Sequence, residues 1–335
     1  MSQLPQISVV LPVFDGQPHL AESVESVLAQ QGVEFDLLAC DDGSRDGSLS
    51  WLRSRAREDP RLQVFHNQSN LGLFPTLNRL LREARAPLVR IWTQDDRMLP
   101  GCLDHEQELW RRLPSLGMSY CAYEVIDDAG VVRERVIDRG TPELIEPWLA
   151  DQISLYWGCV TANISTVTLR REVALELGGF DPRFPFAGDF ELWTRISACH
   201  ALGYLPRALV QVRGHARQLS RRRDAFVSYQ REHRLIFERL RERVPPVVAA
   251  RSRAFEDRRQ VLAVHHALRS LFRGRLREAT EVYRELALDA GRLPLRSLAR
   301  WLATGNGRWL RPVPLFLPPT DDQRRVGRGA ATTDS

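Results

Sequence analysis

Two adjacent carboxylates, Asp95 and Asp96, follow directly after an apolar run of the sequence that ends at Thr93. Like charges this close repel each other, so the pair needs a cation or an arginine as a partner. Carboxylate oxygens suit Mg²⁺ or Mn²⁺, and an ion bound there could also hold a diphosphate. The alternative is that the pair only caps the helix expected to begin near Leu99. The motif by itself leaves both interpretations open.

A second acidic pair, Asp41 and Asp42, opens a polar turn that also contains Gly43 and Ser44. A calcium loop is excluded, because the twelfth position counted from Asp42 is Arg53, where such a loop needs a bidentate glutamate. Two interpretations remain. The pair stabilises a turn, or it offers a carboxylate that accepts hydrogen bonds from a nucleobase N–H or from ribose hydroxyls.

Asp189 stands near the start of an expected helix, shortly after the glycine turn at Gly178 and Gly179. An aspartate in this position is usually an N-cap. It is also a place where a general base could be held against an acceptor hydroxyl. His215 lies farther along the chain, and a lone histidine is more often structural than a ligand.

The acidic residues of the first hundred positions follow short runs that are typical of buried strands. We expect strands at residues 7–14, 35–40, 62–66 and 88–93, alternating with helices at residues 20–28, 48–57 and 74–84. This alternation predicts an α/β fold, with a parallel sheet and helices on both of its faces. Ligands of such sheets bind at the carboxyl ends of the strands, so we expect a nucleotide-sized site there.

The rest of the chain is expected to complete this domain and to add a helical extension. Strand-like segments at residues 120–126, 131–137 and 160–170 and a helix at 171–177 continue the first domain, and residues 140–158 are expected to form acceptor-contacting loops. Arginine-rich amphipathic helices are expected at residues 225–243, 253–272 and 276–290. The predicted domains are residues 1–220, a helical extension at 221–312 and a tail at 313–335.

The composition of the 335 residues excludes several other kinds of site. All 47 basic residues are arginine, which removes Schiff bases, P-loop phosphate binding and lysine general bases. The five cysteines are dispersed, so neither a disulfide framework nor a thiolate zinc site is expected. The net charge of +5 is modest, and a solvated basic surface is expected in place of a nucleic-acid site. No apolar run reaches the roughly 18 residues of a membrane span, and the start lacks the pattern of a secretory signal, which predicts a cytoplasmic protein.

Taken together, these motifs resemble the family 2 glycosyltransferases, whose nucleotide-sugar-binding architecture is called the GT-A fold. The resemblance runs from Ile7 to about Ser220. It rests on ISVVLPVFDG, ESVESVLAQ, DDGSRDGS, NLG with Asn78 after it, QDD, GGFD, GDFELWTR and RGHARQLS, in that order. The resemblance therefore implies a GT-A domain, a mixed and mostly parallel sheet, followed by the helical extension.

The resemblance also implies a role for each matching residue. The nucleotide-sugar site would comprise Pro12, Phe14, Asp15, Asp41, Asp42, Asn78, Gln94 and Asp95. Asp95, Asp96 and His215 would hold a divalent metal ion, Mn²⁺ or Mg²⁺, and Asp189 would be the catalytic base of an inverting transfer. The chain departs from the family pattern at Thr93, where the first carboxylate of the DxD motif is missing, and at Gly188, where the family often has glutamate.

By resemblance, the partners would be a nucleoside-diphosphate sugar and a glycan or lipid-linked saccharide acceptor, in bacterial surface polysaccharide synthesis. The arginine-rich helices are expected to be a packing extension or a surface between copies of the chain, with a peripheral membrane contact as the alternative. A dehydrogenase is disfavoured because no GxGxxG follows the first strand. A sugar-nucleotide nucleotidyltransferase would normally offer a glycine-rich loop and a lysine there, and neither is present. An inactive nucleotide-sugar-binding or scaffold protein stays open.

Overall fold

The computed structural model describes residues 6–159, 161, 163–214, 225–290, 299, 302–303, 314 and 316–317. The chain divides into two units, Met1–Pro147 with Thr161–Ala216, and Trp148–Val160 with Arg217–Ser335. The boundaries expected from the sequence, at residues 220 and 312, stay a prediction. His215, the predicted metal ligand, lies outside the described residues.

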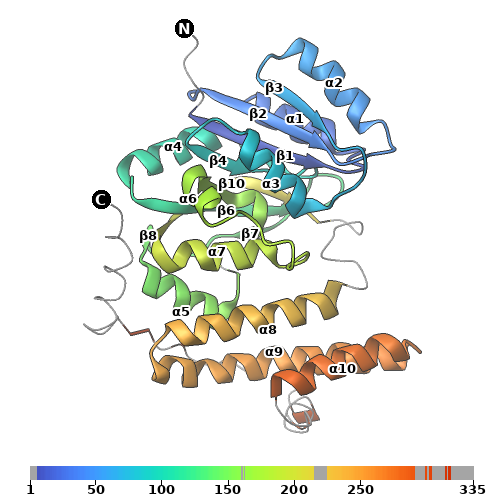
Figure 1. Cartoon of the computed structure of the whole chain (residues 1–335), viewed down its shortest axis with the longest axis vertical. Coiled ribbons are helices and arrows are strands. Elements are labelled where there is room, and N and C mark those ends of the chain that lie inside the picture. Colours follow the sequence, from blue (N-terminus) through green and yellow to red (C-terminus); the bar gives the residue numbers. More distant parts are fainter. Residues whose placement is uncertain are drawn as a thin grey trace. The chain divides into compact units, whose positions relative to one another are not determined.

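The first unit is built on a mixed sheet (Figure 1). Its strands are β1 (Ile7–Val13), β2 (Phe35–Asp41), β3 (Leu62–His66), β4 (Leu88–Ile91), β5 (Arg97–Met98), β6 (Leu116–Ile126), β7 (Val132–Val136), β8 (Leu144–Ile145), β9 (Val167–Arg170) and β10 (Ala201–Arg213). They follow the order β3-β2-β1-β4-β9-β6-β10-β5, with β7 beside β6 and β8 beside β10. The longer strands pair in parallel, and the short strands β5, β7, β8 and β9 run antiparallel to their neighbours. The expected fold class is confirmed.

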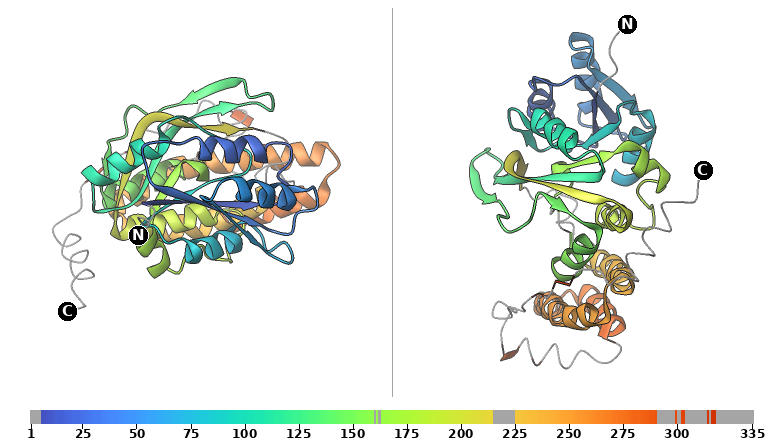
Figure 2. Two further views of the ribbon diagram at one scale, coloured as in Figure 1. Left: turned by 90° about the horizontal axis from the view of Figure 1, so that it is seen from above. Right: turned by 90° about the vertical axis from the view of Figure 1, so that its left-hand side faces the viewer.

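Helices cover both faces of this sheet, as the left view of Figure 2 shows. They are α1 (Leu20–Leu28), α2 (Ser48–Glu58), α3 (Leu73–Glu83), α4 (Cys102–Arg112), α6 (Arg171–Glu176) and α7 (Gly188–Cys199). Alternate residues of β1, Ile7, Val9 and Leu11, join a buried cluster with α1, α2 and α4. Successive side chains of a strand point to opposite faces, so the residues between them face α3. The all-apolar composition of β1 follows from this two-sided burial.

Two elements of the first unit differ from the sequence expectation. Only Val167–Arg170 of the expected strand at 160–170 is a strand, and a short 3₁₀ helix, Ile164–Thr166, precedes it. The long strand β10 has no counterpart among the expected elements. Its pairing with β6 shifts register on either side of Pro206, and proline and glycine inside a strand obscure its alternation.

The second unit is helical. It contains α5 (Pro147–Trp157, from its second residue), α8 (Ala225–Arg243), α9 (Pro246–Phe272) and α10 (Leu276–Ala290), which confirms the expected C-terminal helices. Segment 140–158, expected to be loops, contains β8 and α5. Helix α5 was missed because polar side chains such as Asp151, Gln152 and Ser154 are buried along with its apolar ones, so it shows no clear amphipathic pattern. Helix α9 begins before its expected start because a proline is well suited to the first helical position.

Aromatic contacts and an ion pair connect segments of the second unit. Tyr156 lies 4.7 Å from Phe255 and 5.7 Å from Phe316, measured between ring centroids. Arg243 donates to Asp151 at 2.7 Å, which ties α8 to α5. None of the described helices has a stretch both long enough and apolar enough to cross a bilayer.

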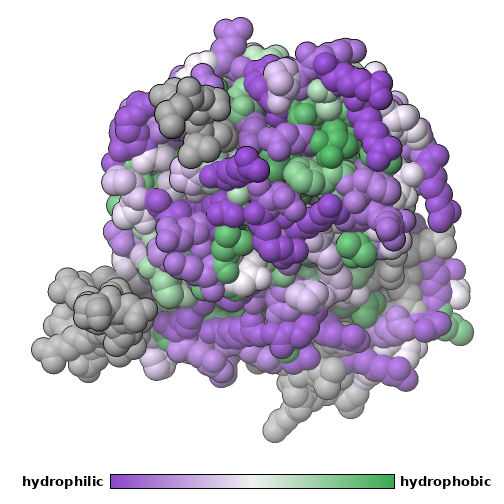
Figure 3. All heavy atoms as spheres, turned by 45° about the horizontal axis from the view of Figure 1, so that its top comes forward, coloured by the Kyte–Doolittle hydropathy of each residue, from purple (hydrophilic) through white to green (hydrophobic). Residues whose placement is uncertain are grey.

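Figure 3 shows a face on which hydrophilic residues predominate and apolar residues form small separate groups.

Candidate active site

The side chain of Gln94 joins the end of β4 to the end of β1. Its Oε1 accepts a hydrogen bond from the backbone N–H of Phe14 at 2.8 Å, and its Nε2 donates to the carbonyl of Phe14 at 3.0 Å. The side-chain amide therefore pairs with the backbone of Phe14 as a neighbouring strand would, just beyond the end of β1. The Phe14 side chain, 42% exposed, is left at the carboxyl edge of the sheet. Pro12, two residues earlier in β1, is buried and lies opposite Cys40 of β2.

Asp15 joins the end of β1 to the turn after β2. Its backbone has a positive φ of 47°, and its N–H donates to Ser44 Oγ at 3.0 Å. Its carboxylate accepts from the backbone N–H of Arg45 at 2.8 Å. The next N–H, of Gly16, donates to Ser48 Oγ at 3.0 Å. The DDGSRDGS segment therefore holds the loop that carries Phe14 and Asp15.

Asp41 and Asp42 are both buried, and they use their carboxylates differently. Asp42 accepts from Asn67 at 2.7 Å and from the backbone N–H groups of Leu71 and Gly72 at 2.9 and 2.8 Å. It therefore anchors the loop after β3. The Oδ2 atom of Asp41 accepts hydrogen bonds from two backbone N–H groups. Its Oδ1 atom has no hydrogen-bond partner among the described residues. Contacts of either residue with a nucleotide stay a prediction.

Asp96 is buried and fully engaged inside the protein. Its Oδ2 accepts from the hydroxyls of Thr93 and Ser165, and its Oδ1 accepts from the backbone N–H of Arg213 at 2.9 Å. Burial raises the pKa of this carboxyl, and the same hydrogen bonds oppose that rise. The hydroxyl of Thr93 donates to Asp96, whereas an aspartate at position 93 would place a like charge near a buried carboxylate.

Arg213, the last residue of β10, clamps the turn that contains Asp95. Its side chain is 1% exposed. Its Nε donates to the Asp95 carbonyl at 3.0 Å, and Nη1 donates to the carbonyls of Asp127 and Asp128 at 2.9 and 2.8 Å. Its Nη2 pairs with Glu22 of α1. One guanidinium thus fixes the turn to two other segments of the sheet edge.

These residues fit a divalent ion in a limited way. Asp95 is half-buried, so a ligand can reach it from solvent, while Asp96 is held by its neighbours. Across the described part of the chain, no group of three or more His, Cys, Asp or Glu side chains gathers in a way that could hold a metal. Mg²⁺ and similar ions are often bound by only one or two carboxylates together with substrate phosphates. Asp95 fits that pattern.

Asp189 is half-buried in the first turn of α7. Burial raises the pKa of its carboxyl to about 6, and a hydrogen bond from the backbone N–H of Phe190 at 2.8 Å opposes the rise. The preceding residue, Gly188, packs closely against the ring of Phe74, and a Cβ at this position would lie 2.8 Å from that ring. A larger residue at position 188 would therefore require the ring of Phe74 to move. That Asp189 and Asp95 face one crevice stays a prediction.

Asn78 of α3 holds the glycine turn before α7. Its Nδ2 donates to the Phe180 carbonyl at 2.7 Å, and its Oδ1 accepts from the Phe180 N–H at 2.8 Å. A Cβ at Gly179 would lie 2.3 Å from Oδ1, so only glycine fits this approach. Both polar atoms of Asn78 therefore serve the turn, and its contact with a nucleotide stays a prediction.

Glu191 and Arg195 support the same turn and were missed from the sequence. Arg195 donates to both oxygens of Glu191 at 2.7–3.0 Å and to the carbonyls of Leu177 and Gly179. Their i, i+4 spacing on a helix was the available signal. The pair fixes the loop that leads to Asp189.

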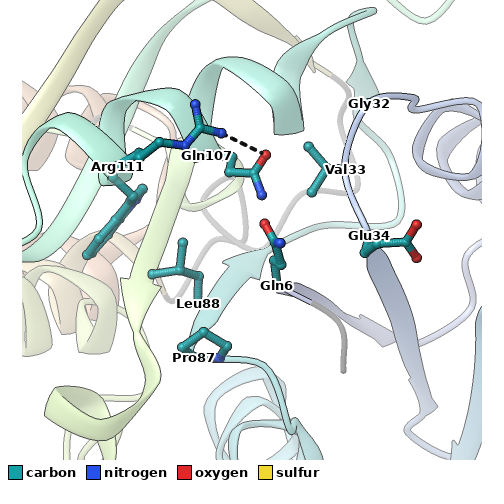
Figure 4. Close-up of a pocket in the computed structure, with 9 residues that line it drawn as sticks. Gln6, Gly32, Val33, Glu34, Pro87, Leu88, Gln107 and Arg111 are labelled. Atoms are coloured by element: carbon teal, nitrogen blue, oxygen red, sulfur yellow. Dashed lines mark hydrogen bonds between the residues drawn. The ribbon is translucent and has the colours of Figure 1, made fainter. Parts of the chain in front are cut away.

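A cavity of about 600 Å³ lies at the other edge of the sheet (Figure 4). It is lined by Gln6, which precedes β1, by Glu34, which precedes β2, and by Leu88, which begins β4. On the α4 side, Arg111 donates to Gln107 at 3.4 Å. These are the amino ends of the strands. The cavity is therefore separate from the acidic residues at the carboxyl edge.

Comparisons with known proteins identify the family of the chain. Residues 8–177 match the family described as Glycosyl transferase family 2. The uncharacterized protein MT1568 of Mycobacterium tuberculosis (strain CDC 1551 / Oshkosh) is 31% identical over 224 residues, which are 63% of this chain and 67% of that protein. EpsE of Bacillus subtilis (strain 168) is 26% identical over 245 residues, which are 70% of this chain and 84% of EpsE. The chain therefore belongs to glycosyl transferase family 2.

Two solved structures share the fold. The structure of S. aureus TarS 1-349 in complex with UDP-GlcNAc aligns with a TM-score of 0.66 at 16% identity and covers 97% of this chain and 91% of that one. The mannosyltransferase PcManGT from Pyrobaculum calidifontis, in complex with GDP-Man and Mn²⁺, aligns with a TM-score of 0.53 at 18% identity and covers 98% and 85%. The protein is a glycosyltransferase with the GT-A fold.

Proposed function

We propose that this glycosyltransferase moves a sugar from a nucleoside-diphosphate sugar to a hydroxyl of a glycan or a lipid-linked saccharide, with inversion at the anomeric carbon. The observation that carries the proposal is the half-buried carboxyl of Asp189, whose pKa burial raises to about 6. Such a group is ionised at neutral pH and accepts a proton more readily than an exposed aspartate. The sequence expectation of a catalytic base at this position motivates the same assignment.

The reaction is a single displacement. The acceptor oxygen bonds to the anomeric carbon while the bond from that carbon to the diphosphate oxygen breaks, and the leaving nucleoside diphosphate keeps the electron pair. Asp189 takes the proton of the acceptor hydroxyl at its carboxylate. Inversion follows because attack and departure occur on opposite faces of the sugar ring. No side chain has to form a bond to the sugar.

The donor would bind at the carboxyl edge of the sheet. The exposed ring of Phe14 would stack on the base, and Asp15 would line the same pocket. A nucleotide sugar in TarS and a nucleotide sugar with Mn²⁺ in PcManGT support this class of donor.

Asp95 would hold the divalent ion, Mn²⁺ or Mg²⁺, and Asp96 and Arg213 would position it. When bound, the ion neutralises charge on the departing diphosphate. Asp96 fixes the turn from the buried side, and Arg213 fixes its backbone at the Asp95 carbonyl. Residues of this kind set the geometry of a ligand without touching the substrate. The proposal also keeps His215, which lies outside the described residues, as a ligand of the divalent ion.

The acceptor and the place of action also belong to the proposal. We infer that the enzyme acts at the cytoplasmic face of a membrane in surface polysaccharide synthesis, with peripheral contact through the C-terminal helices. The arginine-rich composition of those helices supports a contact with anionic headgroups.

A donor screen tests the proposal. Purified protein is incubated with UDP- and GDP-sugars, with and without Mn²⁺, and nucleoside diphosphate release is measured in the presence of short glycan acceptors. We expect release from one donor class that depends on Mn²⁺ and is lost in Asp189→Asn. Asp104→Asn is the matched control, because Asp104 is an exposed carboxylate in the first turn of α4. Equal loss in both variants would contradict the role of Asp189 as the base. Binding of donor with no release under any condition would favour the inactive binding protein.

A further inference from the structure

The turn between α9 and α10 exposes a group of large apolar side chains. We refer to residues 269–277 as the α9–α10 tip. In it, Phe272 is 84% exposed, Leu276 64% and Leu271 47%. The two helices run antiparallel, and the tip lies at one end of the pair (Figure 1). Single exposed apolar residues are ordinary, but three at one turn form a patch that calls for a partner.

The exposure does not come from an unwound helix end. The N–H groups of Gly274 and Arg275 donate to the carbonyls of Leu271 and Ser270, both at 2.9 Å, and Gly274 has the positive φ of 74° that ends a helix. Ser270 is buried beside the exposed Leu271. The turn is thus closed by its own backbone hydrogen bonds, and it points the apolar side chains outward.

An apolar core lies behind the tip. Ala263 and Val264 of α9 and Val282 of α10 are buried together, and Ala267, Leu268 and Val227 of α8 pack against them. The core therefore does not need the tip residues. Burying Phe272 and Leu276 is left to something outside this helix pair.

The charge of the tip indicates what that partner is. Its nine residues include four arginines, at positions 269, 273, 275 and 277, and no acidic residue. Arg277 pairs with Glu281 across one turn of α10 at 3.1 Å, and its own side chain is 94% exposed. Arginines interspersed with an exposed aromatic and two leucines match the headgroup region of an anionic bilayer, where phosphates meet acyl chains.

We propose that the α9–α10 tip inserts into the surface of a membrane that contains anionic phospholipids. Phe272, Leu271 and Leu276 enter the boundary between headgroups and acyl chains, and the arginines contact lipid phosphates. This inference extends the peripheral contact of the proposed function by naming its residues. It does not depend on the transfer reaction, because membrane binding and donor turnover are measured separately.

Vesicle binding by the full chain tests the inference. Sedimentation with vesicles of phosphatidylcholine alone is compared with vesicles in which about a third is phosphatidylglycerol. We expect binding to the anionic vesicles at least about tenfold tighter, and weaker at high salt. The double variant Phe272→Ser, Leu276→Ser should lose about tenfold or more. Arg273→Gln with Arg275→Gln should lose binding to anionic vesicles and most of the salt dependence.

A matched variant at the other end of α9 is the control. Val247 is exposed to 53% and Arg253 is exposed as well, so Val247→Ser with Arg253→Gln removes a similar pair of groups outside the tip. This variant should bind as the unaltered chain does. Nucleoside diphosphate release, measured on every preparation, shows that each variant is folded, and it reports on the proposed function independently.

Two results would overturn the inference. One is equal vesicle binding by the tip variants and the unaltered chain. The other is an absence of binding to anionic vesicles by the unaltered chain. If the molar mass of the tip variants then also falls in analytical ultracentrifugation, the tip is assigned to a contact between copies of the chain.

Discussion

The carboxyl edge of the sheet and the α9–α10 hairpin are stabilised by different kinds of contact. At the edge, side chains from one segment pair with the backbone of another, as Gln94 does with Phe14 and Arg213 with Asp95. The hairpin relies on a small apolar core and leaves Phe272 exposed at its turn. Hydrogen bonds between segments fix the positions of the side chains closely. An exposed apolar surface, by contrast, can be buried by any partner that offers apolar contact. The edge therefore suits chemistry, and the hairpin suits docking.

The largest test of this contrast is Asp189→Asn. Without a carboxylate base, transfer should fall by about 10²- to 10⁴-fold, while donor binding changes little. Because the pKa of Asp189 is raised to about 6, the folded state holds the charged form at a cost above that pH. Removing the charge should leave the unfolding midpoint at pH 8 equal or higher. Kinetics, donor calorimetry and thermal unfolding check the three expectations, and a lower midpoint with weaker donor binding would make Asp189 structural.

The second test asks whether Arg213 positions the turn that contains Asp95 or only stabilises the fold. Arg213→Lys keeps the charge but cannot span the carbonyls of Asp95, Asp127 and Asp128 as the guanidinium does. The Mn²⁺ concentration for half-maximal activity should rise about 10- to 100-fold, with kcat at saturating Mn²⁺ nearly unchanged. Mn²⁺ binding in the presence of nucleoside diphosphate, followed by electron paramagnetic resonance, should weaken by the same factor.

Arg171→Lys is the control for that test. Arg171 also donates to two backbone carbonyls, those of Leu81 and Arg82, but it does so away from the acidic turn. Its replacement should leave the response to Mn²⁺ unaltered. If both variants shift the Mn²⁺ response alike, the effect of Arg213 is on general stability.

The sequence predicted the parts of the molecule in which local signals are strong. The strands β1 to β4 and the helices between them follow alternating apolar runs and turn residues, and their bounds lie close to those expected. Strand β10 and helix α5 were missed, because Pro206 interrupts one pattern and buried polar residues mask the other. Packing against segments that are distant in the sequence determines whether both elements form. A short stretch of sequence does not contain that information.

The motifs named candidate site residues, and the structure shows that several of them have structural partners that the sequence could not supply. By resemblance both Asp95 and Asp96 are expected at the metal, with Asp95 the better candidate as its ligand. The structure adds that Asp96 is enclosed by Ser165 and Arg213, which lie far along the chain. Asn78 likewise pairs with Phe180, about a hundred residues away. Such partners come from the fold, so the roles follow only when the elements are assembled.

A third test uses the acidity of the site. Burial raises the pKa of Asp189 from 3.8 to about 6, so the carboxylate is protonated, and inactive as a base, below that pH. The rate of transfer should be constant above about pH 7 and fall about tenfold per pH unit below 6. Vesicle binding through the α9–α10 tip should not share this profile, because arginine keeps its charge over the whole range. A rate that stays constant down to pH 4.5 would contradict the assignment of the base.

The smallest expected effect is that of Gln94→Glu, which compares the two edges of the sheet. A carboxylate can still accept from the Phe14 N–H but cannot donate to its carbonyl, so one hydrogen bond of the pair is lost. The net value of such a bond is about 1 kcal/mol, so the donor KM should rise about fivefold with kcat little changed. Gln107→Glu makes the same change beside the cavity at the amino ends and should leave KM unaltered. A fall in kcat with constant KM would mean that Gln94 acts on the reacting centre, and the loop that carries Phe14 would then not be part of donor binding.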